Sequence, residues 1–340
     1  MRSIVIMLLT IGLVGGAVAG AYVFGLAPLI KRFNEPKDYT GAGTGKIQVK
    51  IPDGASGQNI AVLLAKDDVV KTEIAFLNAA KKDTRATSIQ PGTYALRKQM
   101  SGASALSLLL DPKSKLTQSV TIPEGTRAKD ALAKISKSLK IKLPDLQKAS
   151  TSGKIGLPKA ANGRLEGFLF PATYQFEPDV SATQVLTTMV QRGTDAFKNL
   201  DIPASQLRAI VIKASIVQAE AGNQKYMGQV ARVLDNRLRV GRKLELDSTV
   251  SYAVQKFNVT TTAADRASTS RFNTYKYAGL PAGPISNPGE EALEAALHPT
   301  PGKWIFFVTT NPSTGETKFA VDEAGHAANV AEFQKWLQTH

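Results

Sequence analysis

One carboxylic acid near the end of a helix is the residue of this sequence best suited to proton transfer. Apolar residues recur at three- and four-residue spacing over residues 205–221, which predicts a helix with Ser205 as its N-cap and Gly222 just beyond its end. Glu220 then lies in the last turn, at the border of the buried stripe. The negative end of the helix dipole and partial burial both favour a neutral acid, as a general acid for glycoside cleavage requires. The alternative is a solvated glutamate.

The sequence around Glu220 holds several motifs in a fixed order. In chain order they are residues 166–174 (EGFLFPATY), 214–221 (ASIVQAEA), 236–238 (NRL), 246–252 (LDSTVSY), 273–275 (NTY) and 279–289 (GLPAGPISNPG). Together they resemble the endolytic murein transglycosylase family, also called MltG or YceG-like. The resemblance keeps order and spacing over residues 160–330, and it extends to the N-terminal segment and to residues 46–112.

The resemblance implies a catalytic residue and a reaction. The family's catalytic glutamate is the second acidic position of the pattern S-I-V-E-x-E, which is Glu220 here. Many members have Glu where this chain has Gln218, and an amide cannot transfer protons, so we expect one carboxyl group to act. The implied reaction cuts the bond between N-acetylmuramic acid and N-acetylglucosamine and closes a 1,6-anhydro ring, with Glu220 as acid and then as base. No cofactor and no metal are expected, since the chain has three His and no Cys.

Other polar and aromatic side chains of these motifs are candidates for contact with sugar or for stabilising positive charge. They are Gln218, Asn236, Asp247, Ser248, Thr249, Tyr252, Asn273, Tyr275, Asn287, Glu166 and Tyr174. Structural alternatives stay open for three positions in this region: Asp247 as a helix cap, Arg237 as the partner of a buried acid, and Glu166 as support behind the site.

The first 32 residues predict a membrane anchor. Residues 4–30 contain no charged side chain, and a helix of that length, about 40 Å, exceeds the hydrocarbon core of about 30 Å. The short N-terminal flank indicates a cytoplasmic N-terminus and a single pass through the cell membrane. A cleaved signal peptide ending at Ala19 is the alternative. In both cases residues 31–340 are exported, so we expect membrane lipid and peptidoglycan strands as partners, with cell-wall synthesis proteins as further candidates, and no nucleic acid.

The charge of the chain supports the same partners. It has 42 Lys and Arg against 28 Asp and Glu, a formal net charge of +14. Most of the excess falls in residues 1–150, which suits anionic lipid or wall polymer. A solvated basic surface is the alternative interpretation.

The predicted fold class is α+β, with five segments. Residues 1–32 are the anchor and residues 33–45 a linker rich in Gly and polar residues. By resemblance, residues 46–112 form a LysM-like subdomain. Residues 113–155 are expected to form a second small βα unit, because VTIPEG at residues 120–125 repeats VKIPDG at residues 49–54. Residues 156–340 form the catalytic domain, with helices near residues 185–200, 205–221 and 227–240, a hairpin at residues 304–320 and a last helix at residues 327–337.

Three functions remain open on these grounds. The first is a membrane-anchored endolytic transglycosylase that uses Glu220. The second is a non-catalytic wall-binding scaffold that recruits synthesis machinery. The third is a hydrolytic muramidase in which Asp247 or Glu166 is a second acid.

Overall fold

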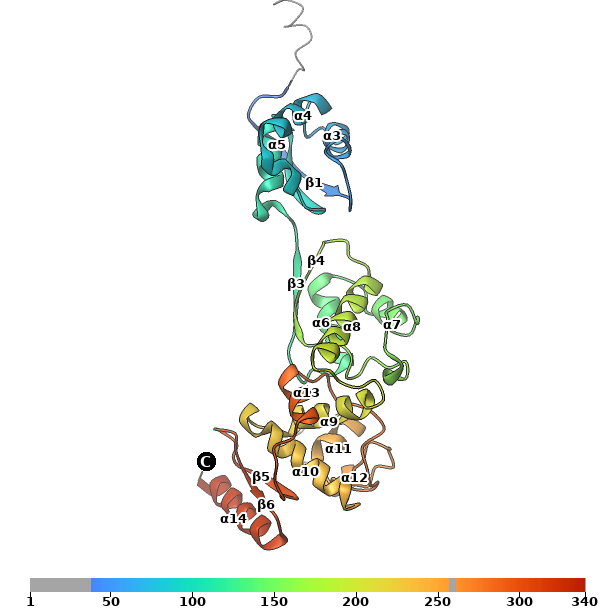
Figure 1. The fold of residues 1–340 in the computed structure, drawn as a ribbon, viewed down its shortest axis with the longest axis vertical. Coiled ribbons are helices and arrows are strands. Elements are labelled where there is room, and N and C mark those ends of the chain that lie inside the picture. The colour runs from blue at the N-terminus through green and yellow to red at the C-terminus, as the bar shows by residue number, and fades with distance from the viewer. Residues whose placement is uncertain (1–37, 257–260, 340) are drawn as a thin grey trace, which may run out of the picture. The chain divides into compact units, whose positions relative to one another are not determined.

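The computed structural model describes residues 38–256 and 261–339 (Figure 1). The predicted membrane segment, residues 4–30, lies outside the described residues. Within the described part, no helix combines the length and the apolar character needed to cross a membrane. The described chain is a mixed α+β protein, as predicted, and its contacts divide it into one unit ending at Thr117 and a second starting at Gln118.

The first unit is a two-stranded antiparallel sheet covered by three helices. Strand β1 (Ala42–Ile51) pairs with β2 (Gly92–Met100), and the helices are α3 (Gly57–Lys66), α4 (Glu73–Lys82) and α5 (Gly102–Leu110). Ser56 and the Asn59 side chain form a capping box that starts α3. The predicted end of the linker, residue 45, is wrong, because β1 already begins at Ala42 and the last residues of the predicted linker pair with β2.

The second unit begins with a sheet of two strands that are far apart in sequence. Strand β3 (Gln118–Ile122) pairs with β4 (Ala172–Phe176), and α6 (Ala128–Leu139), α7 (Leu143–Ser150) and α8 (Ala182–Asn199) complete one apolar core with them. This core joins residues on both sides of position 155. The division in the structure therefore falls before β3, and residues 113–155 do not form a unit of their own.

A second core of this unit surrounds the helix that carries Glu220. Helix α9 (Leu207–Glu220) packs against α10 (Met227–Arg239), α13 (Glu290–Leu297) and the short α11 (Asp247–Ala253), while α12 (Ala263–Arg266) contacts α11. Every residue from 210 to 217 of α9 is buried. Over these residues the helix is enclosed on all sides rather than amphipathic, because neighbouring elements cover the face that the sequence pattern left to solvent, whereas Ala209 and Ala219 nearer its ends are exposed.

Both predicted ends of α9 differ from the observed ones. The helix starts at Leu207 without a side-chain cap, so Ser205 is not its N-cap. It ends at Glu220, and Gly222 is not among the residues with positive φ. A Cβ on Gly222 would instead lie 3.3 Å from the Cα of Gly315. Close approach of another segment, and not a left-handed turn, is what Gly222 permits here.

That other segment is the tip of a C-terminal hairpin. Strand β5 (Phe306–Asn311) pairs with β6 (Glu316–Ala320), and α14 (Glu323–Thr339) packs on β5, as seen at the red end of the chain in Figure 1. Gly315 has φ +70°, and a Cβ there would lie 2.5 Å from the carbonyl oxygen of Gly222. The two glycines thus bring the hairpin against the end of α9.

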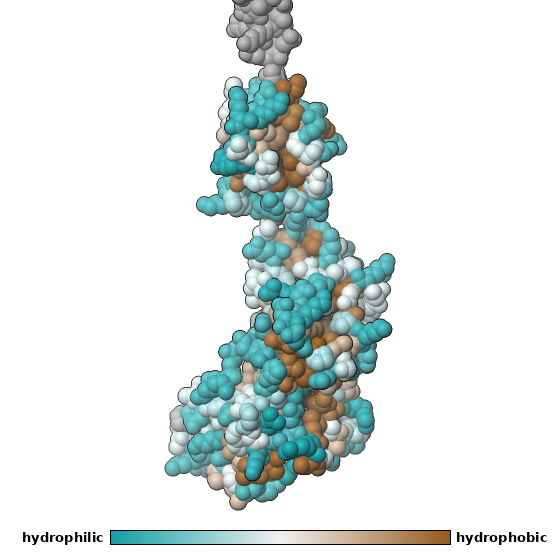
Figure 2. All heavy atoms as spheres, viewed as in Figure 1, coloured by the Kyte–Doolittle hydropathy of each residue, from teal (hydrophilic) through white to brown (hydrophobic). Residues whose placement is uncertain are grey.

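The described surface is largely polar. The large apolar side chains that stay exposed are Val62 and Ile74 in the first unit and Val240, Val321 and Leu337 in the second. On the face shown in Figure 2, hydrophilic residues predominate and hydrophobic areas are smaller. Most large apolar side chains are used in the three cores.

Candidate active site

A groove of the second unit, with a cavity volume of about 640 Å³, has Glu220 in its wall. One wall comes from the end of α9, from α10 and from the segment leading into α11, which contributes Leu244, Glu245, Leu246 and Asp247. The opposite wall comes from β5 and α14. A groove of this volume can hold a segment of a polymeric ligand beside the acid.

Glu220 is held by a residue of α11. The Ser248 hydroxyl donates to Oε1 of Glu220 at 2.5 Å. Burial raises the pKa of Glu220, the neighbouring charge of Asp247 raises it further, and the hydrogen bonds from Ser248 oppose the shift. The predicted direction is confirmed. Its main cause is burial, supported by Asp247.

Asp247 lies in the same groove, where its carboxyl group accepts hydrogen bonds from Thr261 and Tyr275. The Thr261 hydroxyl donates to Oδ1 at 2.5 Å and the Tyr275 hydroxyl to the same oxygen at 2.8 Å. Its carboxylate bonds no amide of its own helix, although it is the first residue of α11, so the capping interpretation is wrong. Burial and Asp247 raise the pKa of Tyr275 to about 12, which keeps this phenol a donor.

Five of the candidate residues are turned away from the groove. Three are buried asparagines whose amides bond to backbone: Asn236 to Gly302 and Trp304, Asn273 to Arg266 and Ser268, and Asn287 to Thr126 and Leu169. The other two are Thr249, which donates to the Leu246 carbonyl, and Tyr174, which donates to the Phe170 carbonyl. In this structure they shape the loops around the site, and none lines the groove.

Gln218 also points elsewhere. It is two residues before Glu220, which places the two side chains on different faces of α9. Its Oε1 accepts the backbone N–H of Gly289 at 2.9 Å, at the start of α13, and its side chain is also bonded to Glu124. Gln218 thus joins α9 to α13, and it brings no second proton-transfer group to the groove.

Glu166 forms a hydrogen-bonded pair with Tyr252 of α11. The Tyr252 hydroxyl donates to Oε2 of Glu166 at 3.0 Å, and the backbone N–H of Ala128 donates to Oε1 at 2.8 Å. Burial raises the pKa of Glu166 to about 7. Neither residue lines the groove of Glu220, so the structure supports the interpretation of Glu166 as a supporting residue.

Sequence reasoning missed the wall opposite Glu220. Its side chains are Phe306, Phe307, Val308, Thr309, Glu323, His326 and Phe333. The hairpin itself was predicted, but no sequence pattern indicated where it packs. The glycines at positions 222 and 315, which allow the close approach, were the available sign. Arg237 beside this wall bonds Glu245 at 3.1 Å and the backbone carbonyls of Lys243, Leu244 and Ile305. Arg237 thus pairs with an acid, as the structural alternative expected, but Glu245 is exposed rather than buried, and Arg237 itself lines the groove.

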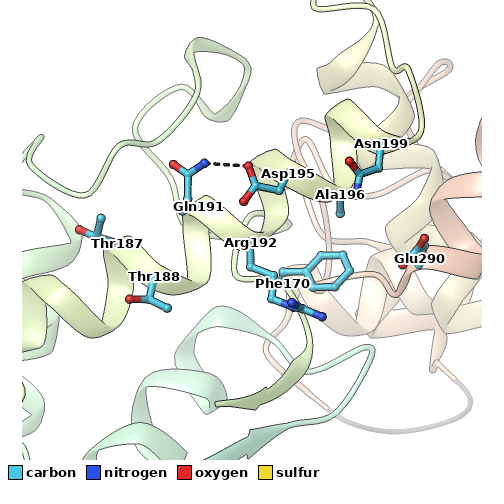
Figure 3. Close-up of a pocket in the computed structure, with 9 residues that line it drawn as sticks. All are labelled: Phe170, Thr187, Thr188, Gln191, Arg192, Asp195, Ala196, Asn199 and Glu290. Carbon is cyan, nitrogen blue, oxygen red and sulfur yellow. Dashed lines mark hydrogen bonds between the residues drawn. The ribbon is translucent and has the colours of Figure 1, made fainter. Parts of the chain in front are cut away.

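A separate hollow of about 490 Å³ follows the polar face of α8 (Figure 3). There the Gln191 amide donates to Asp195 at 2.8 Å, and the guanidinium of Arg192 lies 6.0 Å from the centre of the Phe170 ring. Phe170 is half-buried: it packs against the core around α9 and also lines this hollow. Glu220 and Asp247 do not line this hollow, so it lacks the acid of the groove.

The sequence and the fold match a known class of proteins. The model of the YceG-like family matches residues 49–332. The endolytic murein transglycosylase of Bacillus subtilis is 31% identical over 322 residues, which covers 89% of this chain and 87% of the relative. The chain therefore belongs to the YceG-like family, which confirms the expectation from its motifs.

Two further comparisons extend this match. The endolytic murein transglycosylase of Streptococcus pneumoniae is 27% identical over 328 residues, which covers 84% of this chain and 58% of that longer relative. A crystal structure of a YceG-like protein from Listeria monocytogenes superposes with a TM-score of 0.54 at 28% identity, covering 84% of this chain and 99% of that one.

Proposed function

We propose that this protein is a lytic transglycosylase that cuts peptidoglycan glycan strands at internal bonds, with Glu220 as its acid and base. The observation that carries the proposal is the half-buried carboxyl group of Glu220, whose pKa is raised and which lies in the wall of a groove. The similarity to endolytic murein transglycosylases supports the substrate class.

In the first step Glu220 protonates the glycosidic oxygen between C1 of N-acetylmuramic acid and N-acetylglucosamine, and the C1–O bond breaks. Ser248 donates to Oε1, so Oε2 is the oxygen that carries the proton to the substrate. Positive charge develops at C1. Asp247, charged and held by Thr261 and Tyr275, supplies a negative charge in the same groove to stabilise it.

In the second step the Glu220 carboxylate accepts the proton of the muramyl 6-hydroxyl, whose oxygen attacks C1 and closes the anhydro ring. The hydrogen bond from Ser248 stabilises the carboxylate between the two steps. The attacking hydroxyl belongs to the same sugar, so its effective concentration is high and no second base is needed for water. Glu220 ends the cycle protonated, and no water is consumed.

We also propose that the cut is made close to the cell membrane. Support comes from the 27 uncharged residues 4–30, which are long enough to anchor the chain in lipid with its N-terminus in the cytoplasm. The two described units would then lie outside the membrane, where nascent strands and synthesis proteins are within reach. The family resemblance supports a LysM-like role for residues 46–112 in binding the strand.

Product analysis tests the function directly. Purified glycan strands are incubated with the full chain in detergent, and the new ends are identified by mass spectrometry. We expect anhydro ends from the wild type and at least about 10²-fold slower cutting by Glu220→Gln with an unchanged melting temperature. Ordinary reducing ends would show a hydrolytic muramidase, and uncut strands with retained binding would show a scaffold. Full activity of Glu220→Gln would remove the residue assignment.

A further inference from the structure

The carboxyl group of Glu166 joins two helices that are distant in the sequence. Its Oε1 accepts the N–H of Ala128, the first residue of α6, at 2.8 Å. Its Oε2 accepts the hydroxyl of Tyr252, near the end of α11, at 3.0 Å. The N-cap residue of α6, Arg127, makes no side-chain capping bond, so Glu166 supplies the cap from another segment.

The segment that presents Glu166 is rigidly placed. Gly167 has φ +87°, and a Cβ there would lie 2.5 Å from Cγ of Pro284 and 2.7 Å from Cγ1 of Val211. Two residues later, the N–H of Leu169 donates to the buried Asn287 amide oxygen at 2.9 Å. Because this segment has no room to shift, Glu166 is a fixed point against which α11 is held.

Helix α11 joins Glu166 to the groove. Ser248 and Tyr252 are four residues apart, so they share one face of the helix. At one end of that face Ser248 bonds Glu220, and at the other end Tyr252 bonds Glu166. Arg127 secures the second end as well, with its guanidinium 5.3 Å from the centre of the Tyr252 ring and Nη2 donating to the Lys256 carbonyl at 2.9 Å.

We propose that Glu166 is a positioning residue of the reaction: through Tyr252 it holds α11 so that Ser248 donates to Oε1 of Glu220. This inference rests on the proposed function of Glu220 and goes beyond it, since Glu166 touches no substrate. A helix of seven residues is short, so a shift at Tyr252 moves Ser248 with it.

The two hydrogen bonds of Glu166 favour its charged form. Both oxygens accept, which only a carboxylate does without turning one donor away. Burial raises the pKa of Glu166 to about 7, opposed by the Ala128 and Tyr252 hydrogen bonds and by the charge of Arg127, while Asp130 of α6 adds to the increase. Arg164 faces Tyr252 from the segment before Glu166. Below neutral pH the link is therefore weakened, and above it the link is complete.

The first test compares the pH dependence of full-length wild type and Glu166→Gln on glycan strands. In the wild type we expect kcat to fall as pH drops through about 7. In Glu166→Gln we expect no such fall. At pH 8 its kcat should be about tenfold lower than that of the wild type, because one hydrogen bond that positions α11 is lost, and its KM should be unchanged. A wild-type pH profile and kcat in the variant, or a change confined to KM, would overturn the proposal.

The second test needs no activity. Tyr252→Phe keeps Glu166 and its cap on α6 but removes the link, and ¹³C NMR of labelled glutamate carboxyl groups follows the titration of Glu220. A weaker Ser248 bond must raise the pKa of Glu220 further, since that bond lowers it. An unchanged Glu220 titration in Tyr252→Phe would overturn the proposal.

Matched controls separate positioning from general damage. Glu332→Gln alters an exposed carboxylate that bonds Lys318, and Tyr277→Phe removes a hydroxyl that bonds the Thr269 carbonyl. Both should keep the wild-type profile and titration. Absence of anhydro product from the wild type would contradict the proposed function alone, because the NMR arm still decides whether Glu166 controls the Ser248–Glu220 contact.

Discussion

Ser248 donates a hydrogen bond of 2.5 Å to Glu220, although 28 residues separate them in the chain. The serine comes from the first turn of α11 and the glutamate from the last residue of α9. Asp247, the residue before Ser248, places a negative charge near the same carboxyl group. Two adjacent residues therefore act on Glu220 in opposite directions, and this opposition can be measured.

Ser248→Ala should move the activity of the protein toward alkaline pH. The serine hydrogen bond lowers the pKa of Glu220, so its loss raises that pKa. A general acid works while protonated, and the high-pH limb of kcat/KM therefore shifts upward. The maximal rate should fall about tenfold, because the carboxylate formed in the first step loses a donor. A limb that stays in place would show that Ser248 does not bond Glu220 during turnover.

Asp247→Asn should move the same limb the other way. Its charge raises the pKa of Glu220, so neutralising it lowers that pKa and activity is lost at lower pH. The asparagine side chain also fits this place poorly. The backbone N–H and the hydroxyl of Thr261 each donate to one carboxylate oxygen of Asp247, and in asparagine one of these oxygens becomes an NH₂ donor. We expect a smaller rate loss than in Glu220→Gln. An equal or greater loss, with reducing sugar ends, would favour a hydrolytic muramidase.

Glu166→Gln should flatten the pH dependence of folding stability. The pKa of Glu166 is raised from 4.5 to about 7 in the folded protein. A raised folded pKa gives stability that is complete below the unfolded pKa and is lost as pH rises through the folded one. The wild type should lose up to about 3 kcal/mol of unfolding free energy between about pH 4.5 and 7 from this group. Urea unfolding of both proteins across that range checks the difference; parallel curves would contradict it.

Asn287→Ala should act on stability and leave substrate affinity alone. Its amide accepts from the Leu169 N–H at 2.9 Å and donates to the Thr126 carbonyl at 2.8 Å. The buried Leu169 N–H would lose its partner, whereas the Thr126 carbonyl would keep the backbone N–H of residue 287, so the change costs about 1–3 kcal/mol. Chemical unfolding should show this loss, whereas exposed Asn78→Ala should not. A raised KM with normal stability would return Asn287 to the substrate-binding residues.

Features with a local signal in the sequence were predicted well. The helix expected at residues 227–240 is observed as Met227–Arg239, because apolar periodicity and charged flanks mark it directly. The hairpin expected at residues 304–320 is observed as Phe306–Ala320, because Asn311, Pro312 and Gly315 mark its turn. Such signals depend on neighbouring residues alone.

Features that depend on distant contacts could not be predicted from the pattern. Residues 210–217 of α9 are buried on all sides because α10, α11 and α13 pack around the helix, and the periodicity of the sequence does not indicate this. The sequence of a motif also does not indicate in which direction its polar side chains point. Asn273 and Tyr275 are two residues apart, yet the first bonds backbone in the interior and the second bonds Asp247 in the groove.

The contact between Gly222 and Gly315 gives the site a mechanical property. Backbone meets backbone there, with 2.5 Å between the carbonyl oxygen of Gly222 and the place where a methyl group on Gly315 would begin. Strand β5, which leads into the turn before Gly315, lines the groove together with Glu220, so this contact limits how closely the hairpin approaches the end of α9. The methyl group of an alanine at position 315 would push the hairpin away from the end of α9 and widen the groove without altering any group that reacts.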